Sequence, residues 1–331
     1  MRCGPSPPLR ARQRSKGRID RVTDRQDRRV AAVIAAFNPD EDLLVNAAAI
    51  RAQVDELVVV DDGSPAPAAA GIFTRLRDQG VEVLVQPHNS GIAAALNRGV
   101  GELRSTMSPE FILTFDQDSL PAPDYVANAL ASYARATASG RKVGFVCAES
   151  FSGHPVPALG RADSLAEAFD PMQSGFLIPV STFAAIGTFE TGFFIDCVDS
   201  EFTARARAAG YSVLIGAGCE VGHRLGARLP ARLFGRPLRF RGTGLSFNYY
   251  SPSRMYYIVR NGTTLVRRYW RRNPAWVLRR LVEETKAQLL RFVFSPDRGK
   301  LTIAAWHGLL DSRRGQQGRI SDELVSRFRA R

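Results

Sequence analysis

The chain has 331 residues, enough for one large α/β domain with an appended element or for two modest domains. About 45% of the residues are hydrophobic, and no run reaches the roughly 18 apolar residues that a transmembrane helix requires. The net charge of +13 is uneven, with +7 in residues 1–29, −6 in residues 30–253 and +12 in residues 254–331. Basic ends around an acidic middle indicate that the ends face a polyanion, either nucleic acid or an anionic membrane.

Residues 1–29 are rich in Arg and Pro and lack the apolar segment of a secretory signal, so we expect a disordered extension. The four cysteines are widely spaced and form no zinc motif, which is typical of a reducing compartment. We therefore expect a cytoplasmic protein, peripheral on the inner face of the plasma membrane if the basic ends bind lipid.

From Val30 onward, short apolar runs alternate with helical patterns of 10–15 residues. The expected strands are 30–37, 57–60, 81–86, 111–115 and 143–148, with helices within 42–53, 68–79, 90–103 and after Pro123. This alternation predicts βαβ units and an α/β fold with a doubly wound, mostly parallel sheet.

The second half of the chain is less regular. It contains an expected strand at 176–180, a helix at 198–209, a further strand at 211–215, a mobile basic loop over 222–247, and helical segments at 256–270 and 275–294.

Polar clusters follow four successive expected strands. They are Asn38-Pro39, Asp61–Ser64, His88–Gly91 and Asp116–Asp118. Ligands of doubly wound sheets bind beyond the carboxyl ends of the strands, so these clusters predict a nucleotide-binding edge.

Asp116 and Asp118 are candidate metal ligands. Burying two carboxylates at a strand end is costly unless they share a cation, and hard oxygen ligands suit Mg²⁺ or Mn²⁺. The alternative is a solvated, Asp-rich turn. His223, in a Gly-flanked turn, is a further candidate ligand, with a purely structural role as its alternative.

Five residues are candidate nucleotide contacts. Asp62 carries a carboxylate for a base or a ribose, and Phe37 an aromatic face for a pyrimidine ring. Asn89 and Gly91 place an amide and a permissive backbone at a helix start, and Asn97 lies on that helix. The alternatives are an Asx turn, a core aromatic and ordinary surface polarity.

Together these motifs resemble the inverting glycosyltransferase family 2, which has the GT-A fold. The matching residues are Phe37-Asn38, Asp61–Ser64, Asn89–Gly91 with Asn97-x-Gly99, Asp116–Asp118, and Asp199-x-Glu201 with Arg205, spread over residues 30–226. The resemblance implies a nucleotide-sugar donor, a metal on Asp118, and Asp116 near the ribose or phosphate.

The same resemblance makes Asp199, six residues before Arg205, the catalytic base. We expect Asp199 and Glu201 to face one cleft at a helix N-terminus, which favours their ionised forms. Capping of the helix by the two acids is the alternative. Val198 replaces an acidic residue of the family pattern, which leaves Asp196 as a weaker rival base.

Three segments of the chain are similar to the corresponding segments of rhamnosyltransferases: residues 174–175, 194–202 and 251–261. This implies dTDP-L-rhamnose as the donor and a saccharide or lipid-linked glycan acceptor in cell-surface polysaccharide assembly. Galactofuranosyl- or other hexosyltransferases that use UDP-sugars are the alternative.

The expected domains are the extension 1–29, a catalytic domain 30–248 (nucleotide-sugar half 30–120, acceptor half 121–248) and a basic, mainly helical region 249–331.

Residues 254–294 place Leu and Val near one helical face beside several Arg, as in a helix lying on anionic lipid. Packing on the catalytic domain, or a homo-oligomer contact, is the equal alternative.

A nucleic-acid-binding protein on a nucleotide-fold scaffold is a different class of protein. The acidic middle of the chain and the absence of nucleic-acid-binding motifs disfavour it, so we expect no nucleic-acid partner. A nucleotidyltransferase is a third class, because it also uses paired carboxylates. It would normally have a Gly-rich, basic phosphate loop after the first strand, and residues 38–41 are neither Gly-rich nor basic.

Overall fold

The computed structural model describes residues 28–65, 67–162, 165–223, 228–233, 236–240, 243–244 and 246–329. Residues 1–27, most of the expected extension, and residues 224–227 of the expected basic loop lie outside these ranges.

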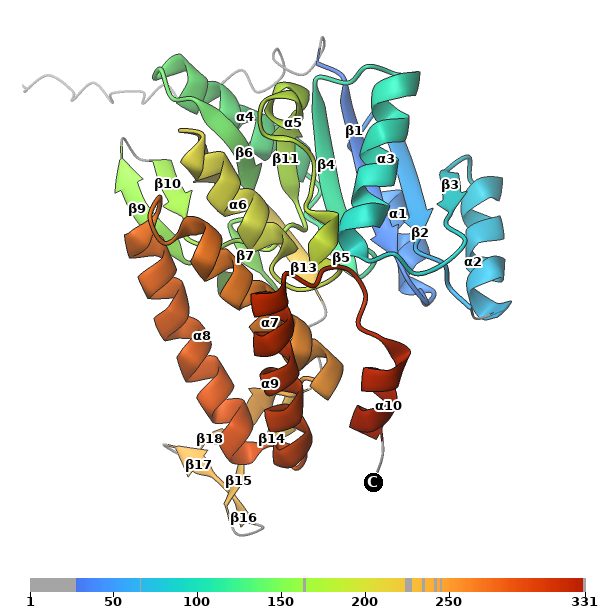
Figure 1. Cartoon of the computed structure of the whole chain (residues 1–331). Coiled ribbons are helices and arrows are strands. Elements are labelled where there is room, and N and C mark those ends of the chain that lie inside the picture. The colour runs from blue at the N-terminus through green and yellow to red at the C-terminus, as the bar shows by residue number, and fades with distance from the viewer. Residues whose placement is uncertain are drawn as a thin grey trace, which may run out of the picture.

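A nine-stranded sheet forms the centre of the molecule, in the order β3-β2-β1-β4-β11-β6-β12-β10-β9 (Figure 1). Its strands are β1 (Val30–Ala36), β2 (Glu56–Asp61), β3 (Glu82–Val85), β4 (Phe111–Asp116), β6 (Val143–Cys147), β9 (Ala158–Ala162), β10 (Leu165–Ala168), β11 (Phe176–Pro179) and β12 (Ser212–Ile215). The first four run parallel, as do β6 and β12, while β11 is antiparallel to both its neighbours. The predicted α/β class with a doubly wound, mostly parallel sheet is therefore confirmed.

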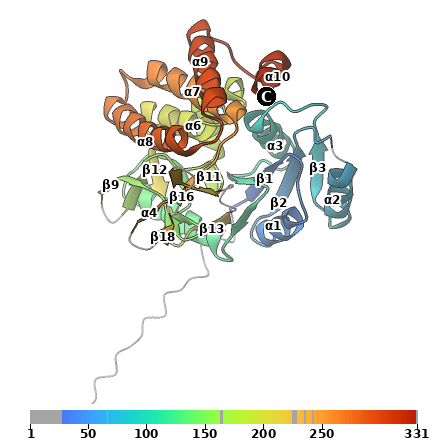
Figure 2. The same cartoon turned by 90° about the horizontal axis from the view of Figure 1, so that it is seen from below.

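Helices cover both faces of this sheet. They are α1 (Asp42–Arg51), α2 (Pro67–Asp78), α3 (Ile92–Thr106), α4 (Tyr125–Ala138), α5 (Val180–Ile186) and α6 (Val198–Ala208). The helices α3 and α6 lie on one face, and α1 and α4 on the other (Figures 1 and 2). Every residue of β1 is buried, which explains why this strand has a continuous apolar sequence instead of an alternating one.

A small second sheet has the order β5-β13-β7-β8. Its strands are β5 (Ser119–Pro121), β7 (Ser150–Phe151), β8 (His154–Pro155) and β13 (Glu220–His223). The antiparallel pairing of β13 with β5 places His223 opposite Ser119. This sheet therefore brings the end of the acceptor half to the end of β4.

The region expected as a basic loop is partly ordered into short strands. Beyond β13 the described residues form β14 (Arg228–Pro230), β15 (Arg232–Leu233), β16 (Arg236–Pro237), β17 (Arg239–Phe240), β18 (Thr243–Gly244) and β19 (Ser246–Asn248). These strands pair antiparallel, β14 with β19, β15 with β16 and β17 with β18, so the loop expectation was wrong for these segments.

Four helices follow: α7 (Pro252–Tyr269), α8 (Pro274–Phe294), α9 (Arg298–Arg314) and α10 (Asp322–Arg329). The first two correspond to the expected helical segments, and α9 and α10 are additional. Ser251 caps α7 by accepting a hydrogen bond from the Arg254 backbone N–H, and Pro252 occupies its first turn. Met255 and Tyr257 of α7 pack with Leu301 of α9 in a core of their own, against which Phe194 and Ile195 also pack. Within the described part of the chain, no helix has the length and apolar character to cross a membrane.

Candidate active site

The strand order brings three polar clusters to one edge of the sheet. In the register of the central strands, Ala36 of β1 lies beside Asp61 of β2, and Ala35 lies beside Asp116 of β4. Phe37 and Asn38 follow directly after β1. Their backbone N–H groups donate to Gln117 Oε1 and Ser64 Oγ, each at 2.8 Å, so the ends of the three strands are joined. The Phe37 side chain remains 39% exposed at this edge.

The Asp62 carboxylate holds the loop that follows β3. One oxygen accepts hydrogen bonds from Gln86 Nε2 and the Ser90 backbone N–H, and the other accepts from the Gly91 backbone N–H. Burial raises the pKa of Asp62, against the opposing effect of the Ser90 and Gly91 N–H groups. Both oxygens of Asp62 therefore hold this loop, whereas the Asx turn named as the alternative is made by Asp61, whose Oδ1 accepts a hydrogen bond from the Ser64 backbone N–H at 3.0 Å.

Gly91 allows the two halves of the domain to approach closely. Its φ is +94°, and a Cβ there would lie 2.3 Å from the carbonyl oxygen of Phe194. The neighbouring Ile92 N–H donates to that same oxygen at 2.9 Å. Gly91 thus joins the start of α3 to the loop before α6.

The two Asn candidates differ in their surroundings. Asn97 is engaged at both ends of its amide by the Phe189 backbone: Nδ2 donates to the carbonyl at 2.8 Å, and Oδ1 accepts from the N–H at 2.9 Å. Asn97 therefore also joins the two halves. Asn89 Oδ1 is buried and has no hydrogen-bond partner among the described residues. Of the two amides, only that of Asn89 has an oxygen left for a ligand.

Asp116, Asp118 and His223 form a cluster in which one ligand atom from each residue lies within 4.8 Å of the others. His223 Nδ1 is 3.4 Å from Asp118 Oδ1 and 3.0 Å from Ser119 Oγ. Burial, and then the charge of Asp118, raise the pKa of Asp116 to about 7, while a hydrogen bond from Gln173 opposes the rise. Two carboxylates that repel one another beside an imidazole are a donor set that fits Mg²⁺ or Mn²⁺.

The loop before α6 has an unusual backbone. Phe194, Asp196 and Cys197 all have positive φ values, between 62° and 65°. Such conformations cost free energy in non-glycine residues and persist only where the surroundings impose them. The loop leads into α6, whose second residue is Asp199.

Asp199 is partly exposed, and its Oδ1 accepts a hydrogen bond from the Ser200 backbone N–H at 2.8 Å. Burial, and then the charge of Asp170, raise the pKa of Asp199 to about 7. The Ser200 N–H at the start of α6 lowers this pKa, as expected for a helix N-terminus, but burial and the charge of Asp170 outweigh it.

Glu201 does not share a cleft with Asp199, contrary to our expectation. Its side chain is 3% exposed, with Oε2 2.8 Å from Arg205 Nη2. Its other oxygen, Oε1, accepts a hydrogen bond from the Tyr269 hydroxyl at 2.8 Å. Glu201 thus fastens α6 to the end of α7, because two positions along a helix rotate the side chain by about 200° and direct the two acids of this first turn to different faces.

Arg254 connects residues 194–197, which precede the expected base Asp199 and which we call the base loop, to the expected metal cluster of Asp116, Asp118 and His223. The sequence analysis did not single out Arg254 as a site residue. Its guanidinium bonds the carboxylate of Asp196, with Nη2 2.5 Å from Oδ1, and its charge also lowers the pKa of Asp116. The Arg254 side chain lies over the ring of Tyr250, 4.4 Å from the centroid. The detectable signal was the Ser251-Pro252 helix start, which places Arg254 in the first turn of α7.

Residues 31–173 match the family model described as "Glycosyl transferase family 2". The match covers less than half of the chain's 331 residues. No curated protein matches the chain.

Among solved structures, the chain is similar to GalNAc-T7 with UDP, GalNAc and Mn²⁺, at a TM-score of 0.54 and 13% identity over 92% of this chain and 59% of that one. S. aureus TarS gives a TM-score of 0.47 at 14% identity, over 72% of this chain and 40% of the other. TarS 1–349 in complex with UDP-GlcNAc gives 0.49 at 14% identity, over 88% and 94%. The chain thus spans 40% and 59% of the lengths of TarS and GalNAc-T7. The likeness to GalNAc-T7 supports the GT-A fold.

Proposed function

We propose that this chain is an inverting, metal-dependent glycosyltransferase that moves a sugar from a nucleotide-activated donor to a saccharide or lipid-linked glycan. The observation that carries the proposal is the arrangement around Arg254. Arg254 bonds Asp196, near the proposed base, and its positive charge lowers the pKa of Asp116, which supports our placing the proposed base and the proposed metal cluster in one site. The family 2 match over residues 31–173 supports the reaction class.

In this proposal Asp199 removes the proton from the acceptor hydroxyl. Its Oδ1 is held by the Ser200 N–H, so Oδ2 is the oxygen that receives the proton. A pKa of about 7 places the carboxylate near the value at which a general base works best at neutral pH. The acceptor hydroxyl attacks the anomeric carbon of the donor sugar on the face opposite the leaving nucleotide. This attack inverts the anomeric configuration.

Asp118, Asp116 and His223 would hold the metal ion, and its chemistry when bound is to neutralise the departing diphosphate. Arg254 adds a second positive charge beside this cluster. Phe37, exposed at the same edge, offers its ring to the base of the nucleotide, and Asn89 Oδ1 offers a free acceptor.

We propose L-rhamnose, from dTDP-L-rhamnose, as the sugar. The support is the similarity of residues 174–175 and 194–202 to rhamnosyltransferases, together with the position of Ser174 at the site. The Ser174 hydroxyl contacts the Asp116 backbone N–H at 3.2 Å and Ser119 Oγ at 2.7 Å. A UDP-hexose is the second candidate, because the GalNAc-T7 structure of the same fold contains UDP and Mn²⁺.

The deciding experiment is a donor-hydrolysis screen with dTDP-L-rhamnose, UDP-galactofuranose and UDP-N-acetylglucosamine, each with Mn²⁺, with Mg²⁺ and with EDTA. We expect metal-dependent release of nucleoside diphosphate from dTDP-L-rhamnose above the other two donors. Turnover of a UDP-sugar alone would move the proposal to the second candidate. Hydrolysis of none of them, with no thermal shift from dTDP plus Mn²⁺, would contradict a glycosyltransferase.

The variant Asp199→Asn tests the base. The amide cannot accept the acceptor proton, so we expect transfer to fall by about 10²–10⁴-fold, the usual contribution of a general base. Donor binding, measured by calorimetry with dTDP and Mn²⁺, should remain unchanged because Asp199 lies outside the metal cluster. The variant Asp196→Asn keeps an oxygen that can accept from Arg254, so it should lose less transfer than Asp199→Asn; the reverse order would make Asp196 the base.

A further inference from the structure

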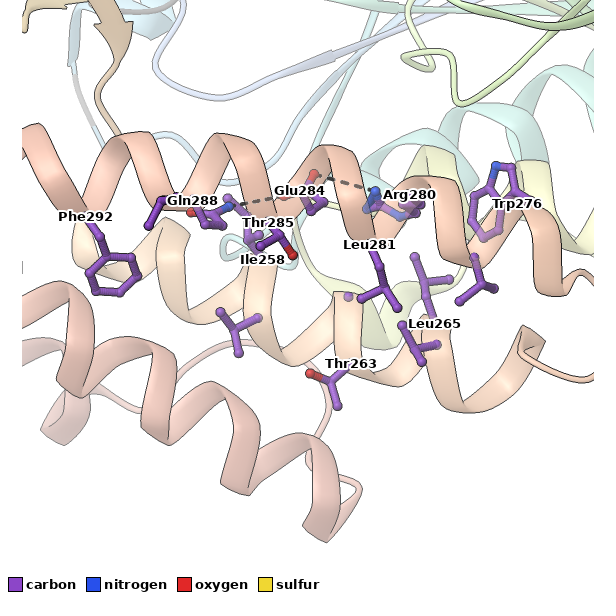
Figure 3. Close-up of a pocket in the computed structure, with 15 residues that line it drawn as sticks. Ile258, Thr263, Leu265, Trp276, Arg280, Leu281, Glu284, Thr285, Gln288 and Phe292 are labelled. Atoms are coloured by element: carbon purple, nitrogen blue, oxygen red, sulfur yellow. Dashed lines mark hydrogen bonds and ion pairs between the residues drawn. The ribbon is translucent and has the colours of Figure 1, made fainter.

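The helix α8 diverges from α7 and leaves an apolar groove between them. The groove encloses about 380 Å³, within the range of small-molecule sites. Figure 3 shows the side chains of the two helices facing one another across it, with Trp276 at one end and Phe292 at the other. These two residues are sixteen positions apart, so the groove follows about 24 Å of α8.

The lining of the groove is chiefly hydrocarbon. It includes Ile258, Leu265 and Val266 from α7, and Val277, Leu281 and Leu289 from α8. Leu281 is 40% and Leu289 is 63% exposed, so these side chains remain in contact with water. Apolar surface left open in a concave site is typical of a place that an apolar ligand covers.

One end of the groove reaches the base loop. Arg280 is part of the groove wall, and its guanidinium lies 3.1 Å from both Asp170 Oδ2 and Cys197 Sγ. Cys197 is the residue immediately before α6, two positions before Asp199. A molecule with its chain in the groove therefore has its head beside the loop that carries the proposed base.

The charge of the surrounding helices favours an anionic ligand. Residues 254–331 contain eighteen basic and six acidic side chains, a net charge of +12. The charged residues that line the groove, Arg280 and Glu284, lie 3.6 Å apart, so the attraction for a phosphate on a hydrocarbon chain comes from the net positive charge of the region around the groove.

We propose that the α7/α8 groove binds the hydrocarbon chain of a lipid-phosphate-linked acceptor and so presents the acceptor saccharide to Asp199. This inference rests on the proposed function, since it names the acceptor class of the same site. It differs from general contact with a membrane surface, because a single chain is held between two named helices.

Gly262 offers a direct test. It lies on the groove-facing side of α7, and a Cβ there meets nothing within 4 Å. Gly262→Leu therefore starts its side chain in open space on the groove side of α7 and removes a glycine from a helix interior, which favours folding. Gly101 on α3 is equally open and lies away from the groove, so Gly101→Leu is the matched control.

The probe is farnesyl phosphate with a diazirine on its chain, used below its critical micelle concentration and mapped by mass spectrometry after photolysis. We expect saturable labelling of α7 and α8, competition by farnesol, and no competition by inorganic phosphate. Gly262→Leu should reduce labelling about tenfold or more, because the displaced chain loses its burial, and Gly101→Leu should not.

Labelling spread over the whole surface, or unchanged in Gly262→Leu, would overturn the proposal. Competition by inorganic phosphate as strong as by farnesol would overturn it too, because the site would then recognise only the anion. A dimer in sedimentation velocity that Gly262→Leu converts to a monomer would assign the groove to a second copy instead. Donor hydrolysis is measured on the same variants without a lipid, so a failure of the proposed function is separate from a failure of the groove.

Discussion

Asp199 lies beside a second carboxylate, Asp170, within a small network of polar contacts. The Ser200 hydroxyl donates to Asp170 Oδ2 at 3.0 Å, and Arg280 Nη1 lies 3.1 Å from the same oxygen. The charge of Asp170 raises the pKa of Asp199, and the charge of Arg280 lowers it. Neither Asp170 nor Arg280 belongs to a sequence motif. Their position near Asp199 emerges only from the fold, which brings Arg280 of α8 and Asp170, from the segment after β10, to the start of α6.

The variant Asp170→Asn tests this network by pH dependence. The base acts when it is ionised, so activity should rise with pH through the Asp199 pKa of about 7. Removal of a neighbouring negative charge favours the ionised form, and we expect the acidic limb of the kcat/KM profile to move down by about one pH unit. Activity below pH 7 should therefore increase relative to the maximum.

The control for that variant is Glu167→Gln. Glu167 bonds the Ser212 hydroxyl at 2.9 Å, and it is not among the charges that shift the pKa of Asp199. Its pH profile should match that of the unchanged protein. An acidic limb that stays in place in Asp170→Asn would show that Asp170 does not set the pKa of the base.

At the scale of secondary-structure elements, α7 organises the base loop. Asn261 Nδ2 lies within hydrogen-bond distance of the carbonyls of Phe193, Ile195 and Asp196, at 2.8, 2.9 and 2.9 Å. The buried guanidinium of Arg260 bonds the Phe193 carbonyl at 3.2 Å. These contacts explain how residues with positive φ persist before α6, because the loop backbone is held by side chains from the C-terminal region.

The variant Asn261→Ala should loosen this loop. It leaves buried carbonyls without their donor, and we expect a loss of about 1–3 kcal/mol in the free energy of unfolding, measured by urea denaturation. Transfer should fall, while Mn²⁺ affinity measured by calorimetry should not, because His223 is positioned by β13 and β5.

Thr302→Ala is the control on α9. The Thr302 hydroxyl donates only within its own helix, to the Arg298 carbonyl, and the expected change in stability is below about 0.5 kcal/mol. Equal losses in the two variants, or a fall in Mn²⁺ affinity in Asn261→Ala, would contradict a specific role for α7 in holding the base loop.

At the scale of the whole molecule, the C-terminal helices combine positive charge with exposed apolar side chains. Leu278 and Leu290 of α8 are 56% and 52% exposed, and Trp306 of α9 is 56% exposed. We propose that this surface rests on the anionic inner face of the plasma membrane, where a lipid-linked acceptor is available. Contact between two copies of the chain through the same helices is the competing proposal.

Flotation of the full chain with vesicles tests the membrane contact. We expect binding to vesicles that contain anionic lipid, weakening as the salt concentration rises, and little binding to neutral vesicles. The double variant Leu278→Glu with Leu290→Glu should bind about tenfold more weakly, since it removes apolar area and adds negative charge. Neither residue lines the α7/α8 groove.

Val45→Glu on α1 is the matched control, because Val45 is 62% exposed on a helix of the catalytic domain. Its flotation should be unchanged. Equal flotation of all variants, or none with any vesicle, would contradict membrane contact by α8 and favour the homo-oligomer.

Local sequence patterns were enough to predict the fold class and the sheet edge at which the polar clusters meet. The apolar runs of β1, β2 and β4 are local signals, and the rule that parallel strands share a carboxyl edge then groups Asp61 with Asp116. The helical pattern of α7 and α8 was visible for the same reason, since periodicity depends only on near neighbours.

Only the tertiary structure decided which of the candidate side chains meet. His223 reaches Asp118 because β13 pairs with β5 across about a hundred residues of chain, and Glu201 is buried because the fold places Tyr269 of α7 against it. Arg254 enters the site because α7 begins beside the base loop. Such contacts join residues far apart in the chain, and their free energy comes from packing and burial that no local pattern records.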